Sequence, residues 1–212
     1  AVREDNPEFQ AAIKKGIPIL QRAQMLAELM RFRQGISIAG THGKTTTTAM
    51  VASMLKACGK NPTVIVGSLL AEGGTNFIQG DSEYLVVEAC EYRRSFLNLH
   101  PTHILVTNID SDHLDYYKDI DDTHSAFQSF AHLAPKEGLL ITHANVSLLT
   151  EGTNVNADVI DKDSIKLSVL GDHNKQNAQL ALALAKSLEL DEAAARKGLE
   201  AFSGTWRRLE YR

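Results

Sequence analysis

Residues 40–48 read GTHGKTTTT, and they directly follow the short apolar run ISIA at residues 36–39. An apolar run of this length that ends at a glycine is typical of a buried parallel strand. A strand, a turn with glycines, a lysine followed by a hydroxyl residue, and then a helix form the arrangement of a phosphate-binding loop. In such a loop the backbone amides and the helix N-terminus face a polyphosphate.

This loop predicts individual roles for its side chains. Lys44 is expected to reach the β- and γ-phosphates, and the Thr45 hydroxyl to be a ligand of the Mg²⁺ that bridges them. Ile38 stands where the usual loop has its first glycine, so the loop is a shortened variant. The alternative is a glycine turn with a threonine cap and a solvated lysine. Nucleotide contacts are expected from Gly40, Thr41, His42, Gly43, Lys44, Thr45 and Thr46.

The rest of the chain alternates apolar runs with segments of helical spacing. The runs at residues 62–67, 84–89, 103–108 and 138–142 repeat the pattern of the first strand, and helical periodicity marks residues 7–15, 22–33, 174–188 and 191–202. Strands that are apolar on both faces and alternate with helices imply a parallel sheet covered on both sides. The predicted fold is therefore α/β: a mostly parallel sheet flanked by helices and carrying a phosphate-binding loop. The turn-rich connection at residues 71–82 is long enough to suggest a functional loop.

Composition excludes several classes of protein. With 212 residues, one main domain is expected, and a net charge of -4 provides no global positive field for nucleic acid or an anionic membrane. Two cysteines are too few for a disulfide framework. No apolar run is long enough for a membrane span, and the first residues lack the apolar region of a signal peptide. We expect a cytoplasmic protein that binds neither nucleic acid nor membranes.

A second group of polar residues lies at 107–117, with the sequence TNIDSDHLDYY. It follows a predicted strand, and ligands of open parallel sheets bind beyond the carboxyl ends of the strands. Asp110, Asp112 and Asp115 lie near His113, and three carboxylates beside a polyphosphate would repel it unless a cation intervened. These residues therefore suggest a metal site. A surface histidine that only makes hydrogen bonds is the alternative.

Glu88 closes the predicted strand at residues 84–89. A glutamate at the end of an apolar strand is costly to bury unless it meets a cation. That cation is either a metal ion or the guanidinium of Arg93 or Arg94.

Taken in order, the motifs resemble the Mur ligase family. The resemblance rests on GTHGKTTTT, GTN at residues 74–76, YLVVEACEYRRSFL, VTNIDSDHLDYY, GDHNKQNAQLALA and FSGTWRRLEYR. It is strongest to the branch that joins L-alanine to UDP-N-acetylmuramate in peptidoglycan synthesis. It implies that residues 1–33 are the end of an N-terminal, UDP-binding domain, that residues 34–212 are the central ATP-binding domain, and that the C-terminal, amino-acid-binding domain is absent.

The resemblance also implies roles for single residues. Lys44 and Thr45 would hold the phosphates and a first Mg²⁺, and Glu88 and His113 would be ligands of a second, with Mn²⁺ as a substitute metal. Asn174 and Asn177 would face the adenine, although residues in this region can also serve as helix caps. Arg208 would approach the phosphates, with a solvated helix end as its alternative. The catalytic set is Lys44, Glu88, His113 and Arg208.

The implied reaction uses ATP to activate the carboxylate of UDP-N-acetylmuramate as an acyl phosphate, which the amine of L-alanine attacks. Without the third domain, the chain alone is expected to bind nucleotide weakly and to be inactive. The alternatives are a ligase that attaches recycled murein tripeptide to the same nucleotide sugar and, outside the family, a non-catalytic nucleotide-binding module or a kinase with a phosphate-binding loop. The shortened loop, DHLD and HNKQN disfavour the kinase.

Two positions depart from relatives of the family. Cys90 stands where many relatives have an aspartate, and if the strand continued to it, its side chain would share a face with that of Glu88. We therefore predict that alkylation of Cys90 weakens nucleotide binding. Residues 124–133 (HSAFQSFAHL) offer no lysine, whereas several sister ligases carry a carbamylated lysine in this region.

Overall fold

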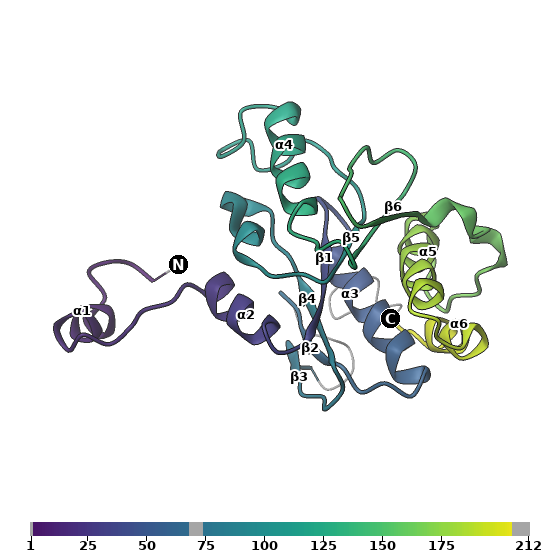
Figure 1. The fold of residues 1–212 in the computed structure, drawn as a ribbon, viewed down its shortest axis with the longest axis horizontal. Coiled ribbons are helices and arrows are strands. Elements are labelled where there is room, and N and C mark those ends of the chain that lie inside the picture. The colour runs from purple at the N-terminus through teal and green to yellow at the C-terminus, as the bar shows by residue number, and fades with distance from the viewer. Residues whose placement is uncertain (1, 68–73, 205–212) are drawn as a thin grey trace.

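A computed structural model describes residues 2–67 and 74–204 of the chain. Its centre is a seven-stranded sheet in the order β3-β2-β4-β1-β5-β6-β7 (Figure 1). All neighbouring strands pair in parallel except β2 and β3, which pair antiparallel. The strands are β1 (Gln34–Ala39), β2 (Thr63–Ile65), β3 (Phe77–Ile78), β4 (Tyr84–Glu88), β5 (His103–Val106), β6 (Leu139–Thr142) and β7 (Thr153–Asn156).

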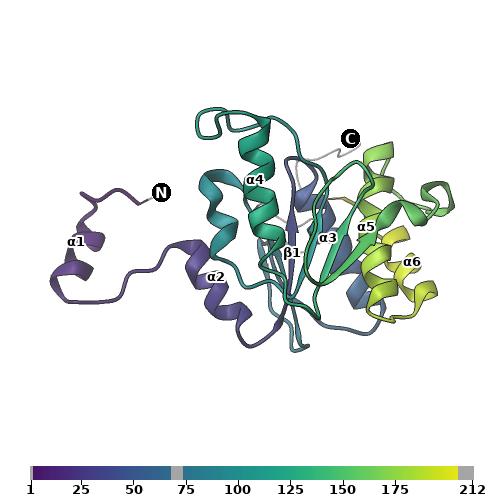
Figure 2. The same ribbon diagram turned by 45° about the horizontal axis from the view of Figure 1, so that its top comes forward.

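Helices cover both faces of the sheet (Figure 2). One face carries α3 (Lys44–Ala57), α5 (Asp172–Ser187) and α6 (Glu192–Glu200), and the other carries α2 (Arg22–Met30), the 3₁₀ segment η1 (Tyr92–Asn98) and α4 (Ile120–Ala131). Two short 3₁₀ turns, η2 (Ala157–Val159) and η3 (Lys162–Ser164), connect β7 to α5. The expected α/β fold with a mostly parallel, helix-covered sheet is confirmed.

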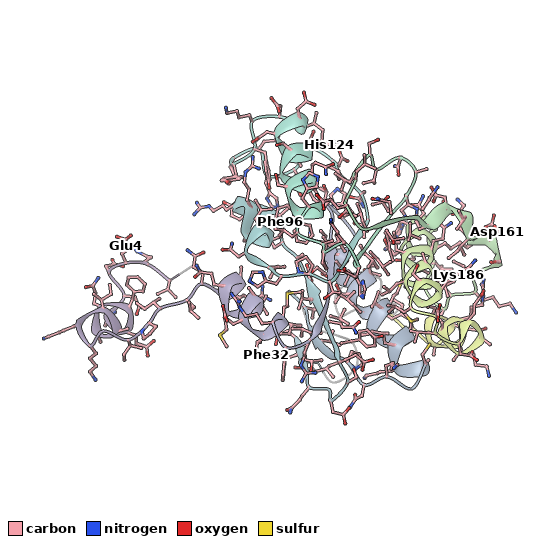
Figure 3. The ribbon with its side chains drawn as sticks, viewed as in Figure 1. Glu4, Phe32, Phe96, His124, Asp161 and Lys186 are labelled. Atoms are coloured by element: carbon pink, nitrogen blue, oxygen red, sulfur yellow. The ribbon has the colours of Figure 1, made fainter. Side chains whose placement is uncertain are left out.

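Side-chain alternation in the strands divides the apolar residues between two cores. In β4, Tyr84 and Val86 pack toward α3 and α5, whereas Leu85 and Val87 pack toward η1 and α4. On the second side, the ring of Phe96 stacks on that of Phe130 with centroids 4.5 Å apart (Phe96 is labelled in Figure 3). Because both faces are covered, the central strands read as nearly continuous apolar runs, interrupted in β1 by the buried Ser37.

The helix α1 (Pro7–Lys14) stands away from the sheet and buries none of its residues (Figure 1). Asn6 caps it by accepting hydrogen bonds from the amides of Glu8 and Phe9. The segment that joins α1 to α2 is exposed, and Phe32, just beyond α2, is 88% exposed (Figure 3).

Several predicted boundaries differ from the structure. The helix expected at residues 22–33 ends at Met30, and the helix expected from residue 174 begins at Asp172. The strands β3 and β7 were not predicted. β3 has two residues, and β7 has the sequence TNVN, whose only apolar side chain is that of Val155. Within the residues that the structure describes, no helix is both long enough and apolar enough to cross a membrane.

The strand order places the carboxyl end of β1 between those of β4 and β5. The chain leaves β1 through α3 toward β2 on one side, and it later returns to pair β5 on the other side. In open parallel sheets, ligands bind at such a switch of direction.

Candidate functional site

The loop between β1 and α3 has the backbone geometry of a phosphate-binding loop. Gly40 has φ +135° and Gly43, the N-cap of α3, has φ +83°, a region that disfavours residues with a Cβ. A Cβ on Gly40 would lie 2.0 Å from Oγ1 of Thr107, and one on Gly43 would lie 2.9 Å from Oδ1 of Asn177. Glycine is therefore required at both positions by conformation and by close packing.

Residues that follow β5 hold this loop in place. Oδ1 of Asn108 accepts from the His42 amide at 2.9 Å, and the Asn108 carbonyl accepts from the Thr41 amide at 3.0 Å. The Thr107 hydroxyl donates to the His42 carbonyl. Neither Thr107 nor Asn108 was predicted to have a role in the site, although they close the predicted strand at residues 103–108 and begin the polar segment at residues 107–117.

Lys44 points back over its own loop. Its ammonium donates to the carbonyls of Gly40 and Thr41 and to Oε1 of Glu91, the last two at 3.0 Å. The side chain of Lys44 is 14% exposed and that of Glu91 is 3% exposed, so the pair is largely removed from water. Glu91 was not predicted as a site residue, and Lys44 is not the solvated lysine of the alternative interpretation.

Glu88 lies beside Thr45 at the start of α3. Its Oε2 accepts from the Thr45 hydroxyl at 3.0 Å and from the Gly67 amide at 2.9 Å. Arg94 pairs instead with Asp122, and the guanidinium of Arg93 lies 5.5 Å from the centre of the Tyr92 ring. The interpretation of Glu88 as a salt-bridge partner of either arginine is therefore wrong for the part of the chain that is described.

His113 approaches the same group from the segment after β5. Its Nε2 lies 3.5 Å from Oε1 of Glu91, and its ring centre lies 4.8 Å from that of Tyr92. His113 has φ +53°, which is uncommon for a residue with a side chain and concentrates at functional positions. Glu91 thus brings Lys44 and His113 together.

The three aspartates near His113 do not converge on one point. Asp110 and Asp112 accept from the amides of the residues that follow them, and Asp115 accepts from the Tyr92 hydroxyl at 2.9 Å. All three are exposed. Across residues 2–67 and 74–204, no three or more His, Cys, Asp or Glu side chains are grouped as metal ligands. The prediction of a metal site built from these three carboxylates is not supported, because they stabilise turns.

A magnesium site is better matched by Thr45 and Glu88. A hydroxyl and a carboxylate are oxygen donors of the kind that Mg²⁺ prefers, and they already lie within 3.0 Å of each other. Oε2 of Glu91 is buried and has no hydrogen-bond partner among the described residues. The donor set therefore fits a hard cation, with His113 as its least typical member.

Asn174 and Asn177 lie in the first turns of α5, and both are buried. Asn177 packs against Gly43 of the phosphate-binding loop. The Asn174 amide donates to the Leu170 carbonyl at 2.6 Å. Gly171, not an asparagine, is the N-cap of α5, so the alternative role as a helix cap is not observed for either residue.

A cavity of about 400 Å³ lies beside the loop at this edge of the sheet. Asn177 and His173 of α5 line it together with residues that follow β5, β6 and β7. On its wall, Nδ1 of His143 is 2.6 Å from Oδ1 of Asp158. Burial raises the pKa of Asp158, but hydrogen bonds from the Ala144 amide and His143 more than offset it and lower this pKa overall. Neither His143 nor Asp158 was predicted, although His143 directly follows a predicted strand.

Arg208 and Cys90 are the remaining residues to which the sequence assigns a role at the nucleotide site. Arg208 lies outside the described residues. The strand β4 ends at Glu88, and Cys90 is exposed while Glu88 is partly buried, so the condition that both lie on one strand face is not met. The alkylation of Cys90 stays a prediction.

Comparisons with known proteins show the family to which these residues belong. Residues 38–161 match the Mur ligase middle domain, and residues 1–34 match the Mur ligase family, catalytic domain. The UDP-N-acetylmuramate–L-alanine ligases of Chelativorans sp. and Mesorhizobium japonicum are 41% and 40% identical, over 99% and 100% of this chain and 53% and 54% of their own lengths. The chain thus spans about half the length of the curated relatives it matches.

Solved structures show the same fold. The crystal structure of the UDP-N-acetylmuramate–alanine ligase of Thermotoga maritima has a TM-score of 0.81 at 29% identity, over 98% of this chain and 54% of that one. A second solved structure is that of a ligase of Neisseria meningitides that acts on UDP-N-acetylmuramate and L-alanyl-γ-D-glutamyl-meso-diaminopimelate. It has a TM-score of 0.83 at 22% identity, over 97% of this chain and 78% of that one, and supports the fold alone. Because the middle-domain match covers more than half of the residues, this chain belongs to the Mur ligase family.

Proposed function

We propose that this chain supplies the site for ATP and Mg²⁺ in a ligase that joins L-alanine to the carboxylate of UDP-N-acetylmuramate in the cytoplasm. The observation that carries the proposal is that two pairs of side chains meet at the start of α3, at the switch point of the sheet: Thr45 with Glu88, and Lys44 with Glu91, which His113 also approaches. Relatives that are about 40% identical and bear the name of this ligase support the choice of substrates.

In this proposal the residues of the chain position the nucleotide and neutralise its charge. The amides of the loop and the N-terminus of α3 face the phosphates, and Lys44 contributes the nearest ammonium. Thr45 and Glu88 would hold one Mg²⁺, and Glu88 with His113 would hold a second. Bound magnesium would offset charge on the transferring phosphoryl group, which activates the carboxylate. Asn177 would orient the base in the adjoining cavity, with Asn174 supporting it and Arg208 approaching the phosphates.

The same proposal assigns the parts of the chain. Residues 1–33 would be the end of a UDP-binding domain, and residues 34–212 would be the central ATP-binding domain. The isolation of α1 from the sheet supports a change of unit within this segment, whereas α2 packs into the core on one face of the sheet. UDP-N-acetylmuramate and L-alanine would be bound with the help of parts of the parent enzyme beyond this chain, so the chain alone is expected to catalyse no ligation.

A calorimetric titration with Mg-ATP tests the proposal. The unmodified chain is expected to bind, and Lys44→Ala is expected to lose most of the affinity because the ammonium that faces the phosphates is gone. Lys60→Ala is the matched control, since Lys60 forms an exposed ion pair with Glu83. Equal binding by the unmodified chain and Lys44→Ala would overturn the site.

The second candidate is the ligase that attaches recycled murein tripeptide to the same nucleotide sugar. The likeness to the Neisseria enzyme shows the fold alone, and the roughly 40% identity to alanine ligases favours L-alanine over tripeptide. An assay of the full-length parent enzyme with L-alanine and with tripeptide separates the two, because each candidate predicts turnover with only one of them.

A further inference from the structure

The three hydrogens of the Lys44 ammonium are already engaged. An ammonium group carries three donors, and here they meet two loop carbonyls and the carboxylate of Glu91. A phosphate oxygen can bind Lys44 only if one of these acceptors gives way. The lysine is therefore held in place before any nucleotide arrives.

Glu91 is built into this position. Glu91 as a whole is 2% exposed. The buried Tyr117 hydroxyl donates to the Glu91 backbone carbonyl at 2.6 Å. Its Oε2 is buried without a partner among the described residues. A carboxylate so enclosed cannot turn to water when Lys44 moves, and it is costly to leave without a cation.

The charges next to the phosphate-binding loop do not favour a free anion. Lys44 provides one positive charge there, and Glu91 and Glu88 provide two negative ones, all in contact with the loop or with Thr45. Low exposure weakens screening by solvent and salt. Only the loop amides would then attract a metal-free polyphosphate. The net charge of the surrounding side chains would repel it.

We propose that Glu91 makes nucleotide binding at this site depend on a divalent cation, because it cancels the charge of Lys44. A polyphosphate that carries Mg²⁺ brings the positive charge that the site lacks, and the same ion gives Glu91 a new counter-charge. Metal-free ATP brings only negative charge and is rejected. This inference rests on the proposed function, since it concerns the same nucleotide site.

The test measures affinity for ATP by calorimetry, once in EDTA and once in excess MgCl₂ at equal ionic strength. The proteins are the 212-residue chain, Glu91→Gln and Glu91→Met. Glutamine keeps the size and one acceptor but removes the charge, and methionine removes both charge and acceptor. Glu83→Gln is the control, because Glu83 precedes the same strand β4 but forms an exposed pair with Lys60.

The unmodified chain and Glu83→Gln are expected to bind ATP at least tenfold more tightly with Mg²⁺ than without it. Glu91→Gln and Glu91→Met are expected to gain at least tenfold in affinity for metal-free ATP. Their affinity for Mg-ATP is expected to fall, because the bound ion loses the Glu91 carboxylate as a counter-charge, so the preference for Mg-ATP shrinks by more than tenfold. A merely structural role for Glu91 predicts instead that both affinities fall together. That result, or an unchanged ratio between the two conditions, overturns the inference and leaves the nucleotide site standing. If the unmodified chain does not bind Mg-ATP, the proposed function fails and the inference fails with it.

Discussion

The burial of His103 predicts that the free energy of unfolding falls measurably in mild acid. It is the first residue of β5, pairs in register with Ile36 and Leu139 on the two neighbouring strands, and is 5% exposed. Neither ring nitrogen has a hydrogen-bond partner among the described residues. Burial lowers the pKa of His103 from 6.5 to about 4, because the charged ring is not solvated there.

The size and sign of the effect follow from proton linkage. The folded pKa is the lower one, so between pH 6.5 and pH 4 the unfolded chain binds more protons than the folded chain. The stability that the neutral, buried His103 allows is present in full above the pKa of the unfolded chain. It is lost as the pH falls toward the pKa of the folded chain. With these two pKa values, lowering the pH from 7 to 5 removes about 2 kcal/mol from the free energy of unfolding.

The assay is urea unfolding at pH 7 and pH 5 for the unmodified chain and His103→Leu. Leucine fills the same buried place without a titrating group, so the variant is expected to lose about 2 kcal/mol less than the unmodified chain over this interval. His100→Gln removes an exposed histidine three residues earlier and is expected to keep the pH dependence of the unmodified chain. If His103→Leu and the unmodified chain lose equal stability, the argument from burial is refuted.

Three further predictions concern the nucleotide site. Gly43→Ala is expected to lower affinity for Mg-ATP at least tenfold, because a Cβ at φ +83° would be strained and would also meet Asn177. Gly59→Ala is the control, because Gly59 has a similar φ of +74° but lies in open space. It should lose only stability, about 1–2 kcal/mol. The sequence prediction that alkylation of Cys90 weakens ATP binding has lost its expected strand geometry, but Cys90 lies two residues from Glu88 and is exposed to iodoacetamide in a Cys58→Ser chain, and unchanged affinity after complete modification would contradict it. Asn177→Ala is expected to weaken ATP and AMP by the same factor in competition titrations, while Lys44→Ala weakens ATP much more than AMP; a loss confined to ATP in Asn177→Ala would argue against a base contact.

Local patterns predict most of the fold because the physics that forms those elements is local. The central strands are apolar on both faces, and the spacing of glycines, lysine and threonine specifies the turn from β1 into α3. β7 escapes prediction because its polar side chains carry no burial signal. It forms at the edge of the sheet, where backbone hydrogen bonds to β6 are sufficient. The metal site expected around Asp110 is not supported, because its three carboxylates are close in sequence but do not converge in space.

Glu91 shows why the charged part of the site is harder to foresee. In the sequence it is one acidic residue among 26, and its burial depends on Lys44, which lies 47 positions earlier. A parallel sheet gathers the carboxyl ends of its strands at one edge. Polar residues that come just after strands are therefore expected to lie near one another. Glu91 follows β4 by three residues, Asn108 follows β5 by two, His143 follows β6 by one, and Asp158 follows β7 by two. In the sequence, Glu91 and His143 lie within two residues of predicted strand ends, and Asn108 closes a predicted strand, so this rule ranks all three near the edge that holds the phosphate-binding loop. Asp158 still escapes this rule, because its strand has no apolar signal to mark where it ends.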